Sequence, residues 1–243
     1  MSISQEKIGI SNIEIDVVRK NIKNMHLAVY PPTGRVRLSA PQKTDYEVLR
    51  LFTISKLGWV KKHIKNFNEQ PRETKRDYIS GESHYIQGKR ALLNLIIEQN
   101  GKNRVEFDGV KQVNFYVKTN TTHEQKAKLM KEWYRNELKK QIPSLIEKWE
   151  KIIGVKPSSW GVKQMTTKWG SCNVEAKRIW LNLELAKKPT ICLEYIIVHE
   201  LVHLLERNHN DKFVSHMNTF MPKWRLYRDE LNSLPVAHND WGY

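Results

Sequence analysis

Val198-His199-Glu200-Leu201-Val202-His203 is the stretch of sequence around which this chain is organised. It lies within residues 189–208, where apolar residues recur at close to helical spacing, so we expect a helix there. On a helix, His199 and His203 are one turn apart and their imidazoles project from the same face. Two neutral imidazoles so placed can bind one Zn²⁺ at about 2.0–2.1 Å. Glu200 would lie beside the metal, where a general base can accept a proton from water.

A third ligand has to come from beyond this helix, because another helical turn would carry a side chain past the ion. His209 follows His203 by six residues, and residues 208–211 have the composition of a turn. Glu206 is the rival ligand, although on a continuous helix it would overshoot the metal by about one turn. We therefore favour His209 and keep Glu206 as the alternative. Cys172 is interpreted as structural, because three histidines complete the protein's share of a catalytic zinc site.

Several separate blocks of the sequence together resemble one known family. These blocks are Lys168-Trp169-Gly170-Ser171-Cys172, Arg178-Ile179-Trp180-Leu181-Asn182, residues 195–204, Asn208-His209 and Phe213. In order and spacing they resemble the YgjP-like metallopeptidase family (DUF45), which is related to the SprT-like zinc proteases. The resemblance implies a zincin-like catalytic domain in which His199, His203 and His209 bind the zinc and Glu200 is the catalytic carboxylate. It leaves the substrate open, because some members of that family are described as nucleotide pyrophosphatases.

Residues 158–183 are expected to form two or three strands that lead towards the catalytic helix. In a zincin-like fold, a strand beside that helix offers a free edge with which an extended peptide can pair. Gly170 would permit a close backbone approach at this edge. The candidate substrate-binding residues are Trp169, Gly170, Ser171 and Arg178. The candidates for a second donor to the oxyanion are Arg178, Lys168, His216 and Tyr195.

The order of the expected elements indicates an α+β protein. Residues 1–120 read as a β-rich N-terminal region whose first strands form a meander or hairpin. Its one helix, at residues 44–68, begins with a capping box of Thr44 and Glu47. Residues 121–243 read as the zincin-like (HExxH) metallohydrolase domain and begin with a long helix at residues 122–153. The sequence shows no internal repeat.

The charge of the 243-residue chain is strongly basic, with a net charge of +15. Such a balance favours polyanionic partners, including nucleic acid. The lysines are spread along the chain, however, so a generally basic surface is the preferred interpretation. With no signal-like N-terminus, no apolar run long enough for a bilayer and only two cysteines, we expect a cytoplasmic protein without a membrane partner.

The favoured function is a zinc-dependent hydrolase, namely a metallopeptidase that acts on a polypeptide. One alternative is a nucleotide (UTP-type) pyrophosphatase with a nucleoside triphosphate as substrate, but the chain lacks a Gly-rich phosphate loop and a carboxylate cluster for Mg²⁺. A second alternative is a non-enzymatic module that associates with nucleic acid and keeps the metal for structure. A purely structural site would not require Glu200.

Overall fold

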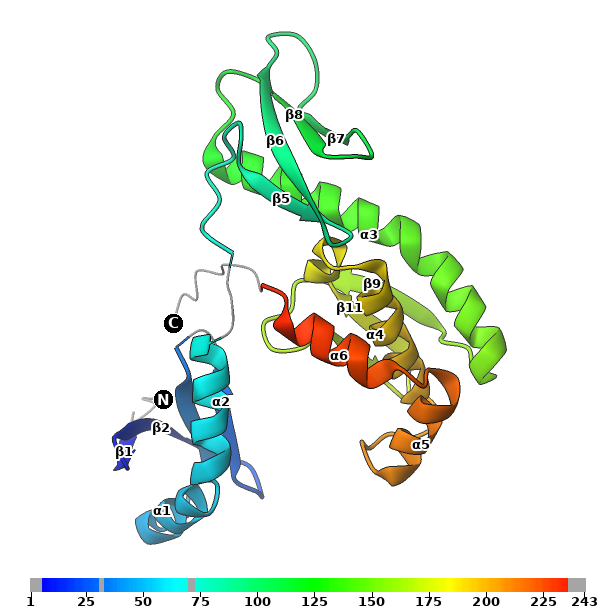
Figure 1. The fold of residues 1–243 in the computed structure, drawn as a ribbon. Coiled ribbons are helices and arrows are strands. Elements are labelled where there is room, and N and C mark those ends of the chain that lie inside the picture. The colour runs from blue at the N-terminus through cyan, green and yellow to red at the C-terminus, as the bar shows by residue number, and fades with distance from the viewer. Residues whose placement is uncertain (1–5, 31–32, 70–72, 236–243) are drawn as a thin grey trace. The chain divides into compact units, whose positions relative to one another are not determined.

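The computed structural model describes residues 6–30, 33–69 and 73–235, which divide into two compact units (Figure 1). Unit 1 contains the described residues up to 69, and unit 2 contains residues 73–235. Both units combine sheets with helices, so the α+β class is confirmed. Among the described residues, no helix has both the length and the apolar character that crossing a membrane requires.

Unit 1 is a four-stranded sheet followed by two helices. Its strands are β1 (Glu6–Ile10), β2 (Ile13–Lys20), β3 (His26–Tyr30) and β4 (Arg35–Pro41), in the spatial order β1-β2-β4-β3. The central strands β2 and β4 are parallel, so the four strands do not form a meander, whereas the consecutive pairs β1-β2 and β3-β4 are antiparallel, as the hairpin alternative expects. Alternating apolar residues indicate which face of a strand is buried, but they do not identify its neighbour in the sheet.

The helix expected at residues 44–68 is interrupted. The structure has α1 (Tyr46–Ser55) and α2 (Leu57–Glu69), because Lys56 between them leaves helical geometry at φ −106° and ψ 4°. The N-cap of α1 is Asp45, without a side-chain capping bond, so the capping box expected at Thr44 and Glu47 is also wrong. Both helices contribute to a core of their own with the sheet, which includes Ile15, Leu38, Leu49 and Val60.

Unit 2 begins with a second sheet that has the same connectivity as the first. Its strands are β5 (Ser83–Ile86), β6 (Lys89–Ile97), β7 (Arg104–Phe107) and β8 (Gln112–Val117), in the order β5-β6-β8-β7 with β6 and β8 parallel. In each sheet the first hairpin turns through two residues with positive φ, Ser11-Asn12 and Gln87-Gly88. The structure thus contains a repeat of topology that the sequence does not reveal.

The long helix expected at residues 122–153 is confirmed as α3 (His123–Ile153). Thr122 and Gln125 form a reciprocal capping box at its start, and Gly154 ends it in the left-handed conformation at φ 77°. Its buried face shares one core with the second sheet and with the helices that follow. A boundary at residue 120 would cut through this core, whereas the two units separate near residue 71.

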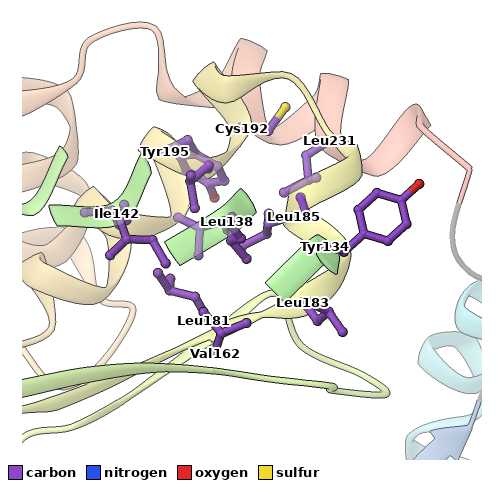
Figure 2. Packing of buried hydrophobic residues seen from close by; sticks show 14 of the residues in the cluster. Tyr134, Leu138, Ile142, Val162, Leu181, Leu183, Leu185, Cys192, Tyr195 and Leu231 are labelled. Atoms are coloured by element: carbon purple, nitrogen blue, oxygen red, sulfur yellow. The ribbon is translucent and has the colours of Figure 1, made fainter. Parts of the chain in front are cut away.

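The remainder of unit 2 holds a small sheet and the helix that carries His199 and Glu200. The strands β9 (Ser159–Lys163), β10 (Gly170–Asn173) and β11 (Arg178–Asn182) have the order β10-β11-β9, so β10 is an edge strand. After the 3₁₀ helix η1 (Leu183–Lys187) come α4 (Thr190–Val202), α5 (Asp211–Phe220) and α6 (Trp224–Ser233). Figure 2 shows side chains from α3, β9, β11, α4 and α6 meeting in the shared core, among them Leu138, Val162, Leu181, Tyr195 and Leu231.

Candidate metal centre

The three histidines singled out by the sequence converge in the structure. One nitrogen from each of His199, His203 and His209 lies within 4.8 Å of the other two, a grouping that could hold a metal ion. The rings of His199 and His203 have centroids 4.9 Å apart, as expected for residues one helical turn apart on α4. The Nε2 atoms of His209 and His199 lie 3.0 Å apart. Three nitrogen donors therefore surround one point beside α4.

The turn that brings His209 back begins earlier than the sequence suggests. The helix ends at Val202, six residues before the expected end at Asn208. The backbone amides of Leu204, Leu205 and Glu206 donate back to Leu201 and Val202, which tightens the chain into a turn. The helical continuation on which Glu206 would have been a possible ligand is therefore absent.

Hydrogen bonds within this turn orient His203 and engage Glu206. Nδ1 of His203 donates to the carbonyl oxygen of Glu206 at 3.1 Å, so its Nε2 is left without a proton and can act as a donor atom for a metal. The carboxylate of Glu206 accepts from the amide of Asn208 at 3.2 Å. Among the described residues, the metal-binding group contains the three histidines and not Glu206.

Phe213 forms an apolar support for all three imidazoles. Its ring centroid lies 5.0 Å from that of His199 and 4.8 Å from those of both His203 and His209. The start of α5 holds it in place, because Asn210 Oδ1 accepts from the Phe213 amide at 3.0 Å. This packing fixes the rings in one arrangement.

Burial keeps two of the histidines in the neutral form that binds metals. The pKa of His199 falls to about 3, chiefly through burial, with the neighbouring His203 and His209 adding to the shift. Burial also lowers the pKa of His203, against the opposing effect of its bond to Glu206. Both imidazoles are therefore ready to bind a metal without first losing a proton.

Glu200 lies on α4 with its side chain close to Gly170 of β10. Its side chain is buried, and burial raises its pKa to about 8 although the ammonium group of Lys168 opposes the shift. A Cβ atom at Gly170 would lie only 2.5 Å from Glu200 Oε1 and 2.9 Å from Ile196 Cγ2. The absence of a side chain at Gly170 thus allows β10 to lie close to the Glu200 carboxylate.

The histidines and Glu200 open into a cavity of about 660 Å³. One wall is the segment 168–175, which contains β10, and the other is α6 with Arg228, Leu231 and Asn232. A cavity of this volume is typical of a ligand site rather than of a packing defect.

Three of the four expected substrate-binding residues lie at this cavity. Trp169, Gly170 and Ser171 line it, whereas Arg178 does not and is exposed at the start of β11. In the antiparallel register Arg178 pairs with Asn173, at the end of β10 that is remote from Gly170. The assignment of Arg178 to the substrate edge is therefore not supported by its position.

Asn182, at the end of β11, holds the loop that carries Lys168 and Trp169. Its Nδ2 donates to the carbonyl oxygens of Lys168 at 2.7 Å and Met165 at 3.1 Å. Its backbone amide donates to the carbonyl oxygen of Trp169 at 2.9 Å. Its side chain is buried, so these bonds replace water for the loop's backbone. Asn182 therefore sets the position at which the chain enters β10.

Sequence reasoning missed Arg207, Arg228 and Asn232, which also line the cavity. Arg228 and Asn232 are one helical turn apart on α6, so the sequence could have placed them on one face. That this face borders the cavity depends on how α6 packs against α4, and no local pattern reports such packing.

Comparisons with known proteins identify the family of the chain. A search of curated proteins found no match. The crystal structure of the metallopeptidase zymogen of Pyrococcus abyssi abylysin is similar with a TM-score of 0.34 and 18% identity, over 36% of this chain and 89% of that one. The model of the family described as YgjP-like, metallopeptidase domain, matches residues 23–234, which is most of the chain. The chain therefore belongs to the YgjP-like metallopeptidase family.

Proposed function

We propose that this protein is a zinc-dependent peptidase that cleaves a polypeptide held along the edge of β10. The observation that carries the proposal is the convergence of three histidines and one buried carboxylate at a cavity with an edge strand in its wall. An edge strand beside the helix with the histidines also supports a zincin-like arrangement of the catalytic part.

The donor set fits Zn²⁺. His199, His203 and His209 would hold the ion as three imidazole ligands and leave a fourth position open, as in catalytic zinc sites. When bound, Zn²⁺ supplies a Lewis acid that acidifies water and polarises the carbonyl group under attack. The bond from His203 to the Glu206 carbonyl provides the outer support that metal-binding histidines usually have.

Glu200 is the proposed general base. It follows His199 directly in the helix and lines the same cavity, so its carboxylate can reach a water molecule between the histidines and the substrate. In its ionised form it takes a proton from that water and later delivers the proton to the leaving amine. The close packing of Gly170 and Ile196 restricts where the carboxylate can move.

The edge of β10 is the proposed substrate-binding surface. Strand β11 pairs with one edge of β10, and residues Gly170–Asn173 also line the cavity. The N–H and C=O groups at an open edge bind an extended peptide irrespective of its side chains. Trp169 and Ser171 flank Gly170 and would contact the residues on either side of the cleaved bond.

The proposal predicts which substrates the zinc-loaded protein attacks. An unstructured polypeptide should be cleaved, a chelator should stop the cleavage and added Zn²⁺ should restore it. Nucleoside triphosphates should remain intact, with or without DNA. Electrophoresis of the polypeptide and a pyrophosphate-release assay measure the two reactions side by side. Hydrolysis of a triphosphate without peptide cleavage would contradict the proposal and favour the pyrophosphatase alternative.

Gly170→Ala is expected to reduce turnover strongly while most of the zinc is retained. The added methyl group would overlap Glu200 Oε1 and Ile196 Cγ2, so β10 or the carboxylate has to move, whereas no histidine is among the nearest atoms. Misplacing a catalytic group by about 1 Å can cost about 10²-fold in rate. Gly9→Ala is the matched control, because a Cβ atom there meets nothing within 4 Å. Zinc content that falls in step with turnover would show that Gly170 supports the metal centre instead.

A further inference from the structure

We propose that Tyr195 is a catalytic residue of this site. Its hydroxyl group would donate a hydrogen bond to the carbonyl oxygen of the scissile peptide bond as negative charge develops on that oxygen. The inference rests on the proposed peptidase function. A donor aimed at developing charge is among the largest contributions to acyl transfer, and the described site otherwise has no buried donor for it.

Tyr195 lies on the catalytic helix, one turn before His199. The edge of one ring faces the other, with the centroids 6.0 Å apart and the planes at 72°. Tyr195 lines the same cavity as His199 and Glu200. A substrate carbonyl group placed between the histidines and Glu200 would therefore lie near the phenol of Tyr195.

The hydroxyl group of Tyr195 has no protein partner among the described residues. The residue is only 5% exposed, and its hydroxyl oxygen forms no hydrogen bond with those residues. The oxygen is not fully buried, because it is absent from the fully buried side-chain atoms that lack a partner. Since Tyr195 lines the cavity, a ligand bound there could supply the missing partner. Polar groups in buried side chains are usually hydrogen-bonded, so a donor left open at a cavity indicates that a ligand is its partner.

Packing against α6 holds the Tyr195 ring in position. The ring is nearly parallel to that of Trp224, at an angle of 11° and a centroid distance of 6.4 Å. Trp224 is itself fixed, because its Nε1 donates to Asn218 Oδ1 at 2.9 Å. A donor that is already held in place needs no reorganisation when charge develops, which is the condition for strong stabilisation.

The other donors considered from the sequence are less well placed. Arg178 and His216 do not line the cavity, and the ring of His216 stacks on Phe220 within α5. Lys168 lines the cavity but is exposed, so its long side chain is hydrated and mobile in comparison with the packed phenol. Lys168 is the rival that an experiment has to separate from Tyr195.

Tyr195→Phe removes one oxygen atom and keeps the ring packing. We expect kcat to fall by about 10²–10³-fold with KM nearly unchanged, because the hydrogen bond forms mainly in the transition state. Zinc content, measured by metal analysis, should equal that of the parent. The affinity for a phosphinic peptide, whose tetrahedral anion resembles the transition state, should fall by the same factor as kcat/KM. The affinity for an uncleaved product peptide should stay the same.

Matched variants decide between the possible outcomes. Tyr227→Phe makes the same change on α6 outside the cavity and should behave like the parent. Tyr195→Met tests the same loss if the phenylalanine variant does not fold. A parent that cleaves peptides while Tyr195→Phe retains turnover within a few fold would overturn the inference. So would a loss confined to Lys168→Met. A parent that cleaves no peptide would overturn the proposed function itself.

Discussion

Glu200→Gln is expected to lower kcat by about 10²–10⁴-fold while zinc content and folding are retained. The amide has nearly the size of the carboxyl group but cannot accept a proton near neutral pH. Burial already favours the uncharged form of Glu200, as the rise of its pKa to about 8 indicates, so a neutral amide should fit without a large loss of stability. The effect should appear in kcat because proton transfer belongs to the transition state.

Three measurements on the Glu200→Gln variant test this expectation: zinc content, unfolding temperature and turnover beside the parent. Glu175→Gln is the matched control, because Glu175 lines the same cavity but is exposed. Its turnover should stay close to that of the parent. Turnover of Glu200→Gln within a few fold of the parent, with zinc bound, would remove Glu200 from the mechanism.

His209→Ala is expected to abolish measurable turnover by releasing the metal. The parent should hold about one Zn²⁺ per chain, and the variant, with two imidazoles left, should lose most of it on dialysis. Zn²⁺ should also raise the unfolding temperature of the parent, since a ligand that binds the folded state stabilises it, and this rise should be lost in the variant. Metal analysis and thermal melts with and without added Zn²⁺ measure both effects.

Glu206→Ala is the control for the third ligand. The carboxylate of Glu206 bonds to the amide of Asn208 and lies outside the histidine group, so this variant should keep its zinc. A small loss of stability is expected from the weakened turn. Full zinc occupancy in His209→Ala together with zinc loss in Glu206→Ala would reverse the assignment.

The core of the candidate site could be predicted because it depends on local geometry. Residues four apart on a helix share a face, so the sequence alone placed His199 beside His203 and Glu200 next to them. The sequence also predicted that the chain must turn to bring His209 back to the other two histidines, but it did not predict where that turn begins. The helix ends at Val202, after which the amides of Leu204 and Leu205 bond to carbonyl oxygens three residues back instead of four. The helical spacing of apolar residues continues to Leu205, so the sequence does not show this end.

The features that could not be predicted depend on contacts between distant segments. The parallel pairing of β2 with β4 places strands together that are not consecutive, and alternation does not encode it. The register of β10 and β11 pairs Arg178 with Asn173, at the end of β10 remote from Gly170. The wall formed by Arg228 and Asn232 depends on how α6 packs. The place of Tyr195 in the cavity became apparent only when its neighbours were known.

The shared connectivity of the two four-stranded sheets does not extend to the cores into which they pack. The second sheet shares one core with the helices of unit 2, including the helix that carries His199, whereas the first sheet has a core of its own. A cavity made by a large-to-small substitution beneath the second sheet would therefore lie in the same core as that helix, while one beneath the first sheet would lie in a separate core.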